Sequence, residues 1–261
     1  TLALRLGTAA LILLPFAGSL PRGAWRDVRL WVLAMMGGLL YGVLAFAAFK
    51  FAPAAHGAIL LPGMQPFLIA AVAWAISGAR PGSASVAGLV FIAVGIACVA
   101  RHELVGHGSW TPDLLFGDAL LLGSSLAWAI YSVLARKWAY DPWTLTRFVA
   151  LASALVFLPV YLLWLPKALD AVPPSMLALQ GLYQGVAVTI VAMVLFLKAV
   201  AVLGAQRTGA LVALVPVIAG VLAAPLLGEA LSGWLIAGLL FVSAGAFVAV
   251  RPGRKKTNGA P

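Results

Sequence analysis

The chain has 261 residues, of which 64% are hydrophobic and 9% charged, and its mean hydropathy is +1.08. A soluble domain carries about a quarter of charged residues, so this composition excludes an ordinary soluble protein and indicates an integral membrane protein. The formal net charge of +10 does not indicate nucleic-acid binding, because the cations lie between apolar runs, where membrane topology signals belong.

Apolar runs long enough to cross a bilayer, about 20 residues each, follow one another with short separators. The separators carry breaker residues, as in "GSLPRGAWRD" and "LPKALDAVPPS". None of the runs alternates as a membrane β-strand does. The sequence therefore predicts an all-α polytopic membrane protein with nine visible transmembrane helices, at 2–17, 30–50, 56–77, 85–100, 117–135, 145–165, 177–197, 208–227 and 233–250.

The basic residues of the short loops predict the orientation. If the first helix runs from outside to inside, most of the 17 Lys and Arg residues lie on the cytoplasmic side. The outer side then holds Arg5, Lys50, Arg101 and Lys167. We expect a multi-pass protein of the cell (inner or plasma) membrane with a cytoplasmic C-terminus.

An internal repeat follows from two similar stretches, AGLVFIAVG at 87–95 and AGLLFVSAG at 237–245. A shift of 150 residues aligns 55–101 with 205–251 without a gap, and it pairs Pro66 with Pro216 and Gly88 with Gly238. With other offsets, Gly37-to-Lys50 matches Gly185-to-Lys198, and Arg5 matches Arg147. Proline, glycine and arginine in one register over this length indicate a duplication rather than shared composition.

The matched segments have opposite orientations in this topology, and an inverted repeat is typical of secondary transporters. We divide the chain into a first repeat (1–101), an extracytoplasmic linker (102–116), a second repeat (117–251) and a basic cytoplasmic tail (252–261). The second repeat has five helices and the first has four. We expect the missing opening helix, the counterpart of 117–135, to lie before Thr1.

Two stretches carry a resemblance to a known family. "DALLLGSSLAWAIYSVLARKW" resembles the helix that opens a repeat, and "GALVALVPVIAGVLAAPLLGEALSGWLIAGLLFVSAGAFVAVR" resembles the ninth and tenth helices of the EamA-type family in the drug/metabolite transporter superfamily. The resemblance implies two five-helix repeats around a central cavity that binds small metabolites, amino acids or drugs. The chain departs from the family pattern in its missing opening helix and in Ala79, which stands where the second repeat has Glu229.

Polar and aromatic side chains within the spans are the candidates for lining this cavity, because polar groups facing hydrocarbon are costly. Amides and hydroxyls offer hydrogen bonds, and rings offer apolar or cation-binding surfaces. The alternative is that these groups only join helices together, or, for His56, that it marks a helix start at the interface. The candidates are Tyr41, His56, Gln65, Trp128, Tyr131, Gln180, Tyr183 and Gln184.

Other features argue against an enzyme or a metal protein. The string "HELVGH" at 102–107 has its histidines five residues apart, whereas the zinc protease helix needs a spacing of four. We expect no catalytic residues, no cofactor and no metal site, and no nucleic-acid partner. All seven acidic residues fall in loops or at helix ends, so proton coupling would require His56 or a preceding helix.

The sequence predicts a secondary carrier for a small molecule, working by alternating access in the lipid bilayer. A cavity without a buried carboxylate suits small neutral, zwitterionic or amphiphilic solutes better than multivalent anions. A passive channel-like pore and a non-transporting membrane scaffold are the alternatives, and homodimer formation stays open.

Overall fold

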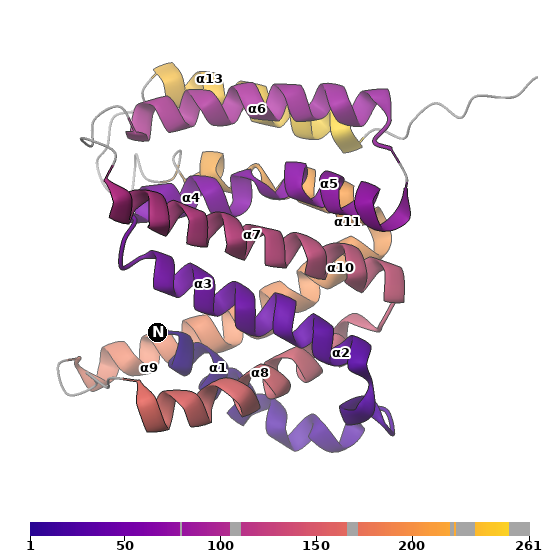
Figure 1. Cartoon of the computed structure of the whole chain (residues 1–261), viewed down its shortest axis with the longest axis vertical. Helices are drawn as coiled ribbons and strands as arrows, with labels where there is room; N and C mark the ends of the chain where they lie inside the picture. Colours follow the sequence, from indigo (N-terminus) through magenta and orange to yellow (C-terminus); the bar gives the residue numbers. More distant parts are fainter. Residues whose placement is uncertain (79, 105–110, 166–171, 220–221, 223–232, 251–261) are drawn as a thin grey trace, which may run out of the picture. The chain divides into compact units, whose positions relative to one another are not determined.

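The computed structural model describes residues 1–78, 80–104, 111–165, 172–219, 222 and 233–250. Every regular element among them is helical, as predicted (Figure 1). The chain forms two compact units. Unit 1 comprises Thr1–Pro53 and Pro112–Ala205, and unit 2 comprises Ala54–Thr111 and Gln206–Pro261. Each unit thus combines segments of both predicted repeats.

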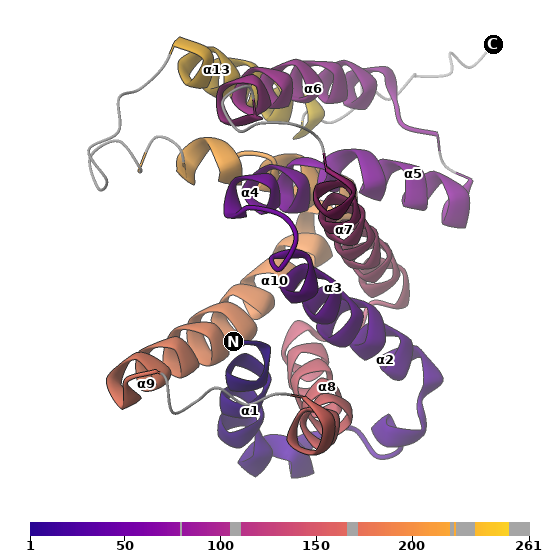
Figure 2. The ribbon, with the colours of Figure 1, turned by 60° about the vertical axis from the view of Figure 1, so that its left-hand side comes forward.

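Unit 1 contains five apolar helical runs, each long enough to cross a membrane. The element bounds are α1 (Leu2–Leu13) with the 3-10 turns η1 (Leu14–Ser19) and η2 (Ala24–Arg26), α2 (Val28–Leu33), the π-helical η3 (Ala34–Leu40), α3 (Tyr41–Ala48), α7 (Pro112–Trp138), α8 (Pro142–Trp164), α9 (Pro174–Leu182), the π-helical η4 (Tyr183–Ala192) and α10 (Met193–Leu203). Helix α1 lies between α8 and the α9–η4 segment (Figure 2).

Local sequence signals explain where two of these helices begin. Asp27 caps α2, and its Oδ1 accepts a hydrogen bond from the Arg29 backbone N–H at 2.9 Å. Asp141 caps α8 in the same way, with the Thr144 N–H 2.8 Å from its Oδ2, and Pro142 occupies the first turn of the helix. A carboxylate there satisfies a backbone donor that the helix leaves without a partner.

Unit 2 contains α4 (Ala54–Gly63), α5 (Gln65–Ser77), α6 (Ser83–Leu104), α11 (Ala205–Val212) and α13 (Gly233–Val250), with further helical residues at 215–219. The predicted span 56–77 is broken between α4 and α5, because Pro62 and Pro66 cannot donate the backbone hydrogen bonds of a continuous helix. The predicted span 208–227 is broken at 213–214, just before Pro216. The two breaks coincide under the 150-residue shift.

Helices α6 and α13 pack antiparallel along a seam of glycines. A Cβ built on Gly88 would lie 2.7 Å from the carbonyl oxygen of Gly245, and one built on Gly245 would lie 2.7 Å from that of Gly88. A Cβ on Gly95 would likewise lie 2.9 Å from the carbonyl oxygen of Gly238. The first glycine of one helix meets the second glycine of the other in both directions, which is the reciprocal pattern of a twofold contact.

This reciprocal contact supports the predicted duplication at one pair of helices. The paired rings of Phe91 and Phe241, which match under the 150-residue shift, lie 6.2 Å apart between centroids. The inverted relation of the two repeats as wholes stays a prediction.

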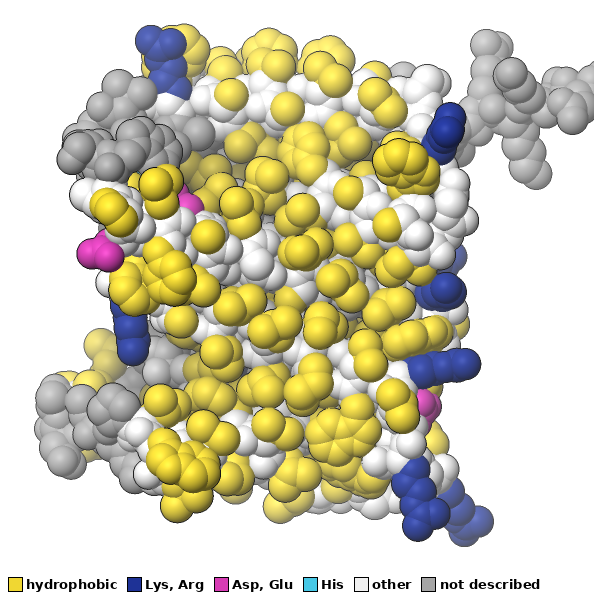
Figure 3. Space-filling model, in the orientation of Figure 1, with side chains coloured by type: hydrophobic (Ala, Val, Ile, Leu, Met, Phe, Trp, Pro, Cys, Tyr) yellow, Lys and Arg dark blue, Asp and Glu magenta, His cyan; other side chains and the backbone are white. Residues whose placement is uncertain are grey.

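The helices have the lengths and surfaces of a polytopic membrane protein. Six are long and apolar enough to cross a bilayer, and shorter apolar helices cover 83–98, 205–219 and 236–249 within the described residues. Hydrophobic side chains cover the helix bodies in Figure 3, and Lys and Arg project at helix ends. The chain is an all-α, multi-pass membrane protein.

Some predicted boundaries differ from the structure. Helix α7 runs over Pro112–Trp138 rather than 117–135, and α6 reaches Leu104, so both ends of the predicted 102–116 linker are helical. Asp113 in the first turn, and Arg136 and Lys137 in the last, suit the two ends of the helix dipole and extend α7 beyond its apolar run. The predicted tail (252–261), Ala79 and Glu229 lie outside the described residues.

Candidate functional site

An aromatic cluster in unit 1 brings together three of the predicted site residues. The Trp128 ring on α7 lies 4.8 Å from that of Tyr41 and 5.4 Å from that of Tyr131, measured between centroids, and 5.0 Å from that of Phe196 on α10. These separations fall in the range of favourable aromatic pairs. Elements α3, α7 and α10 thus each contribute a ring to one surface.

Polar contacts and a glycine hold this cluster in place. The Tyr131 hydroxyl, fully buried, donates to Sδ of Met193 at 3.5 Å. The Ser124 hydroxyl donates to the Tyr41 carbonyl at 2.8 Å, which ties α7 to α3. A Cβ on Gly37 would lie 2.5 Å from the Tyr131 ring, so only glycine allows η3 to approach that ring.

A second polar group joins α1 to η4. The Nε–H of Arg5 donates to the Thr189 hydroxyl at 2.9 Å, and that hydroxyl donates to the Gln184 carbonyl at 2.8 Å. Thr189 is buried, and the Tyr41 phenol lies within electrostatic range of the Arg5 guanidinium. Arg5 therefore joins α1 to η4 within unit 1, whereas the topology count had placed it among the outer basic residues.

Both long runs that flank this region contain π-helical turns. Segment η3 precedes Tyr41, and η4 includes Gln184 and Thr189. These segments lie in the two helices that the repeat alignment matches. Because π-turns occur often at functional sites, their occurrence in both matched helices singles out this part of unit 1.

The remaining candidates lie apart from the cluster. Gln180 and Gln184 are half-buried on α9 and η4, and the Tyr183 side chain is 59% exposed. His56 and Gln65 lie in unit 2, where both are buried, and Gln65 opens α5 directly after the helix break. A single cavity lined by all eight residues involves both units and stays a prediction.

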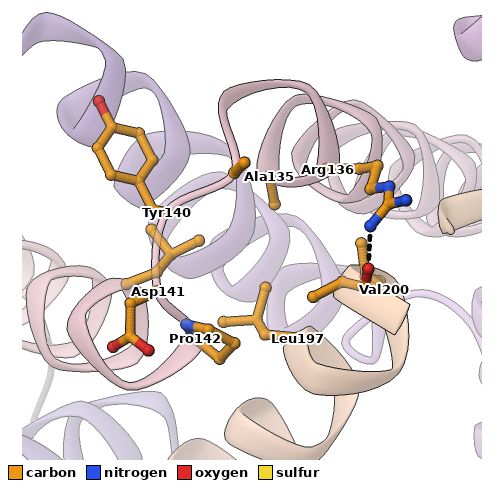
Figure 4. Close-up of a pocket in the computed structure, with 10 residues that line it drawn as sticks. Ala135, Arg136, Tyr140, Asp141, Pro142, Leu197 and Val200 are labelled. Carbon is orange, nitrogen blue, oxygen red and sulfur yellow. Dashed lines mark hydrogen bonds between the residues drawn. The ribbon is translucent and has the colours of Figure 1, made fainter. Parts of the chain in front are cut away.

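A separate cavity of about 270 Å³ lies in unit 1 where α7, α8 and α10 end or begin (Figure 4). Asp141 and Pro142 line one side and Leu197 and Val200 another, while the Arg136 guanidinium donates to the Ala201 carbonyl. Its position at helix ends places it with the loops that the topology assigns to the cytoplasm.

A hydrogen bond outside the spans links the helix ends of the same unit. The Tyr140 hydroxyl donates to Oδ2 of Asp27. This bond is the main cause that lowers the pKa of Asp27. Burial, followed by the same bond, raises the pKa of Tyr140 to about 12.

Sequence reasoning missed Arg5, Thr189 and Phe196 as members of the site. Arg5 carried a usable signal, because an arginine inside an apolar span is costly unless it faces the protein interior. Phe196 carried none, since a phenylalanine in an apolar run is as suited to lipid as to a cluster.

Comparison with known proteins bears on the fold and the family. The EamA-like transporter family model matches residues 115–251, just over half of the chain. The chain belongs to the EamA-like transporter family. A solved crystal structure with 22% sequence identity superposes with a TM-score of 0.76 and covers 95% of this chain and 86% of that one. At this identity the likeness supports the fold alone.

Two curated relatives of this EamA-like chain are named as transporters. The uncharacterized transporter YyaM of Bacillus subtilis is 27% identical over 167 residues, which cover 61% of this chain and 54% of that protein. An uncharacterized transporter of Archaeoglobus fulgidus is 25% identical over 138 residues, which cover 52% of this chain and 46% of that protein. The chain spans about half the length of the curated relatives it matches.

Proposed function

We propose that this EamA-like protein is a secondary transporter that moves a small organic solute across the membrane by alternating access. The observation that carries the proposal is the family match, and the relatives named as transporters support it. The coincident breaks in two matched helices, after Gly63 and at 213–214, add to this support. Interrupted helices in corresponding positions of two halves are typical of the substrate site of carriers.

The chemistry of unit 1 favours an amphiphilic solute. The rings of Tyr41, Trp128 and Phe196 offer an apolar surface that also attracts cations. Arg5 and Thr189 offer polar groups next to it. A solute with an apolar body and one polar end fits this pairing better than a sugar or a multivalent anion.

The orientation proposed for the carrier is the one that places most Lys and Arg residues of the loops in the cytoplasm. The C-terminus faces the cytoplasm of a cell or inner membrane, and the cavity beside Arg136 and Asp141 opens to that side. Access to the site would alternate between this side and the outer side, where α9 begins at Pro174.

Transport by the reconstituted chain tests the proposal. Proteoliposomes preloaded with an unlabelled solute should accumulate the labelled solute by counterflow, and a set of amino acids, nucleosides and amphiphilic amines supplies the candidates. Trp128→Ala removes the ring that touches three others and should abolish counterflow, while Trp234→Ala, on α13, should leave it. Counterflow that equals that of empty liposomes for every solute would refute the carrier function.

Saturation of this flux distinguishes the carrier from the alternative functions, since a pore shows linear flux without counterflow and a scaffold shows no flux. Replacing Gln184 by Leu together with Tyr183 by Ala then tests the flank of the site. Because Tyr183 is 59% exposed, we expect the loss of flux to come from Gln184.

A further inference from the structure

Arg5 is a cation within a membrane-spanning helix, one turn after the start of α1 (Leu2–Leu13). Its Nε–H donates to the buried Thr189 hydroxyl at 2.9 Å. Within the described part of the chain, that hydroxyl is the one hydrogen-bond acceptor of its side chain, and the terminal amino groups make no further hydrogen bond. Charged side chains inside a membrane protein mark functional sites when they face the bundle interior.

Arg147 on α8, its match in the predicted repeat, shows what a structural arginine looks like in this fold. Its guanidinium donates to the Phe16 carbonyl at 3.4 Å, to the Thr144 hydroxyl at 3.2 Å and to the Ser19 hydroxyl. Its Nε–H donates to the Trp143 carbonyl. Every part of that fork is used by the protein, so Arg147 is a clamp between α8 and η1.

The charge of Arg5, like its terminal amino groups, lacks a matching partner in the described part of the protein. Among the described residues, the Tyr41 phenol lies within electrostatic range of the Arg5 guanidinium, and no carboxylate does. A neutral phenol and a threonine hydroxyl do not balance a positive charge. A guanidinium fork is shaped to receive two oxygens of one carboxylate in parallel hydrogen bonds.

The aromatic cluster lies within electrostatic range of this cation. The Tyr41 phenol lies within electrostatic range of Arg5, and its ring lies 4.8 Å from that of Trp128, which in turn contacts Tyr131 and Phe196. A solute whose carboxylate bound Arg5 would extend its apolar part over Tyr41 and Trp128. Because one cation is present, one carboxylate is matched and a second would stay buried without a partner.

We propose that Arg5 binds the carboxylate of the transported solute and so makes the protein selective for small monocarboxylates, including zwitterions, with an apolar body. That the bound solute is also the transported one rests on the proposed transport function. Thr189 is a positioning residue, because its hydroxyl accepts the hydrogen bond of Nε and is itself held by the Gln184 carbonyl.

Binding to the full chain in lipid nanodiscs tests the proposal. The probes are carboxylates paired with their primary amides: benzoate with benzamide, indole-3-acetate with its amide, and leucine with leucinamide. Each amide keeps the shape of its carboxylate and loses the negative charge. Ligand that binds the folded state raises the unfolding temperature. We expect at least one carboxylate to bind about tenfold more tightly than its amide, as a charge-assisted fork requires.

Variants assign that preference to Arg5. Arg5→Gln should bring the ratio of carboxylate to amide affinity to about one, and Arg5→Lys should keep a reduced preference because the charge stays and the fork is lost. Arg22→Gln, an equal change of charge at an exposed loop residue, should leave the ratio as it is. If Arg5→Gln does not fold, Thr189→Val should still lower carboxylate affinity while amide affinity stays.

The outcomes that overturn the proposal are specific. It is wrong if no carboxylate binds more tightly than its amide, or if the preference survives in Arg5→Gln or, where that variant does not fold, in Thr189→Val. A lipid phosphate could satisfy the same cation. If Arg5→Gln lowers stability in phosphatidylglycerol nanodiscs but not in phosphatidylcholine ones, and no carboxylate preference exists, the oxyanion is the lipid's and the solute proposal fails.

Counterflow separates this inference from the transport function. Flux of amides or amines without any carboxylate preference would keep the carrier and reject the role of Arg5. A carboxylate preference that depends on Arg5, with no flux of any solute, would keep the binding site and reject transport.

Discussion

The glycine seam between α6 and α13 predicts that one added methyl group lowers the free energy of unfolding substantially. In Gly88→Ala, the new Cβ would lie 2.7 Å from the Gly245 carbonyl oxygen, 2.7 Å from the Ala249 Cβ and 2.9 Å from the Ala249 backbone nitrogen. Two of these neighbours are backbone atoms of a helix, which cannot change rotamer to make room. The helices must therefore move apart.

The size of the effect follows from overpacking. Inserting a methyl group into a well-packed contact costs about 1–3 kcal/mol, which is about 5- to 150-fold in the unfolding equilibrium constant. Gly245→Ala should cost a similar amount, because its Cβ would meet the Gly88 carbonyl oxygen at 2.7 Å and the Ile92 nitrogen at 2.8 Å. In the double variant the helices have already separated, so the combined cost should be about 1 kcal/mol or more below the sum.

The assay is unfolding by sodium dodecyl sulfate in mixed micelles, followed by tryptophan fluorescence. Gly82→Ala is the matched control, since a Cβ there would meet no atom within 4 Å, and it should change stability by less than about 0.5 kcal/mol. The packing argument is refuted if Gly88→Ala costs no more than Gly82→Ala. If the double variant costs as much as the sum of Gly88→Ala and Gly245→Ala, the two glycines do not share one contact.

Three further predictions concern charged and capping groups of unit 1. Arg147→Gln leaves the acceptors of a buried clamp without their donor and should cost about 1–3 kcal/mol of unfolding free energy, measured in the same micelles against Arg22→Gln; an equal, small effect of both would contradict the clamp. Tyr140→Phe should alter the pH dependence of stability at both ends. The lowered pKa of Asp27 contributes stability that is lost as pH falls below about 3.8, and the raised pKa of Tyr140 contributes stability that is lost as pH rises from 10.0 to about 12. A plot of unfolding temperature against pH should therefore be flatter for the variant in both ranges. Slopes equal to those of the wild type would refute the bond. Asp141→Ala removes the α8 cap and should lower stability by about 1 kcal/mol, with Asp141→Asn, which keeps an acceptor, close to wild type; equal losses would show that the cap is not the cause.

Much of the fold could be predicted from the sequence because a bilayer imposes a one-dimensional rule. Each crossing needs an apolar run of fixed length, so the nine runs and the all-α class follow from hydropathy along the chain. Pro62 and Pro66 mark a disturbed span, and the register of Pro66 with Pro216 and Gly88 with Gly238 indicates a duplication. None of these inferences requires knowledge of which helices are neighbours.

Neighbours and helix rotation were decided by the tertiary structure. Gln180 and Tyr183 satisfy the same rule for polar groups in spans as Tyr41, yet Tyr183 is 59% exposed and Tyr41 contacts Trp128. The π-turns of η3 and η4 rotate the residues that follow them relative to a regular helix, and apolar composition does not encode that rotation.

By itself, the sequence determined that the chain crosses a membrane repeatedly and where its apolar runs lie, because burying apolar side chains in lipid depends on composition alone. The tertiary structure decided that Arg5 donates a hydrogen bond to Thr189, and that α6 packs on α13 glycine to glycine. Those contacts depend on the distance and rotation between helices far apart in the chain, which are set by the packing of all their side chains at once.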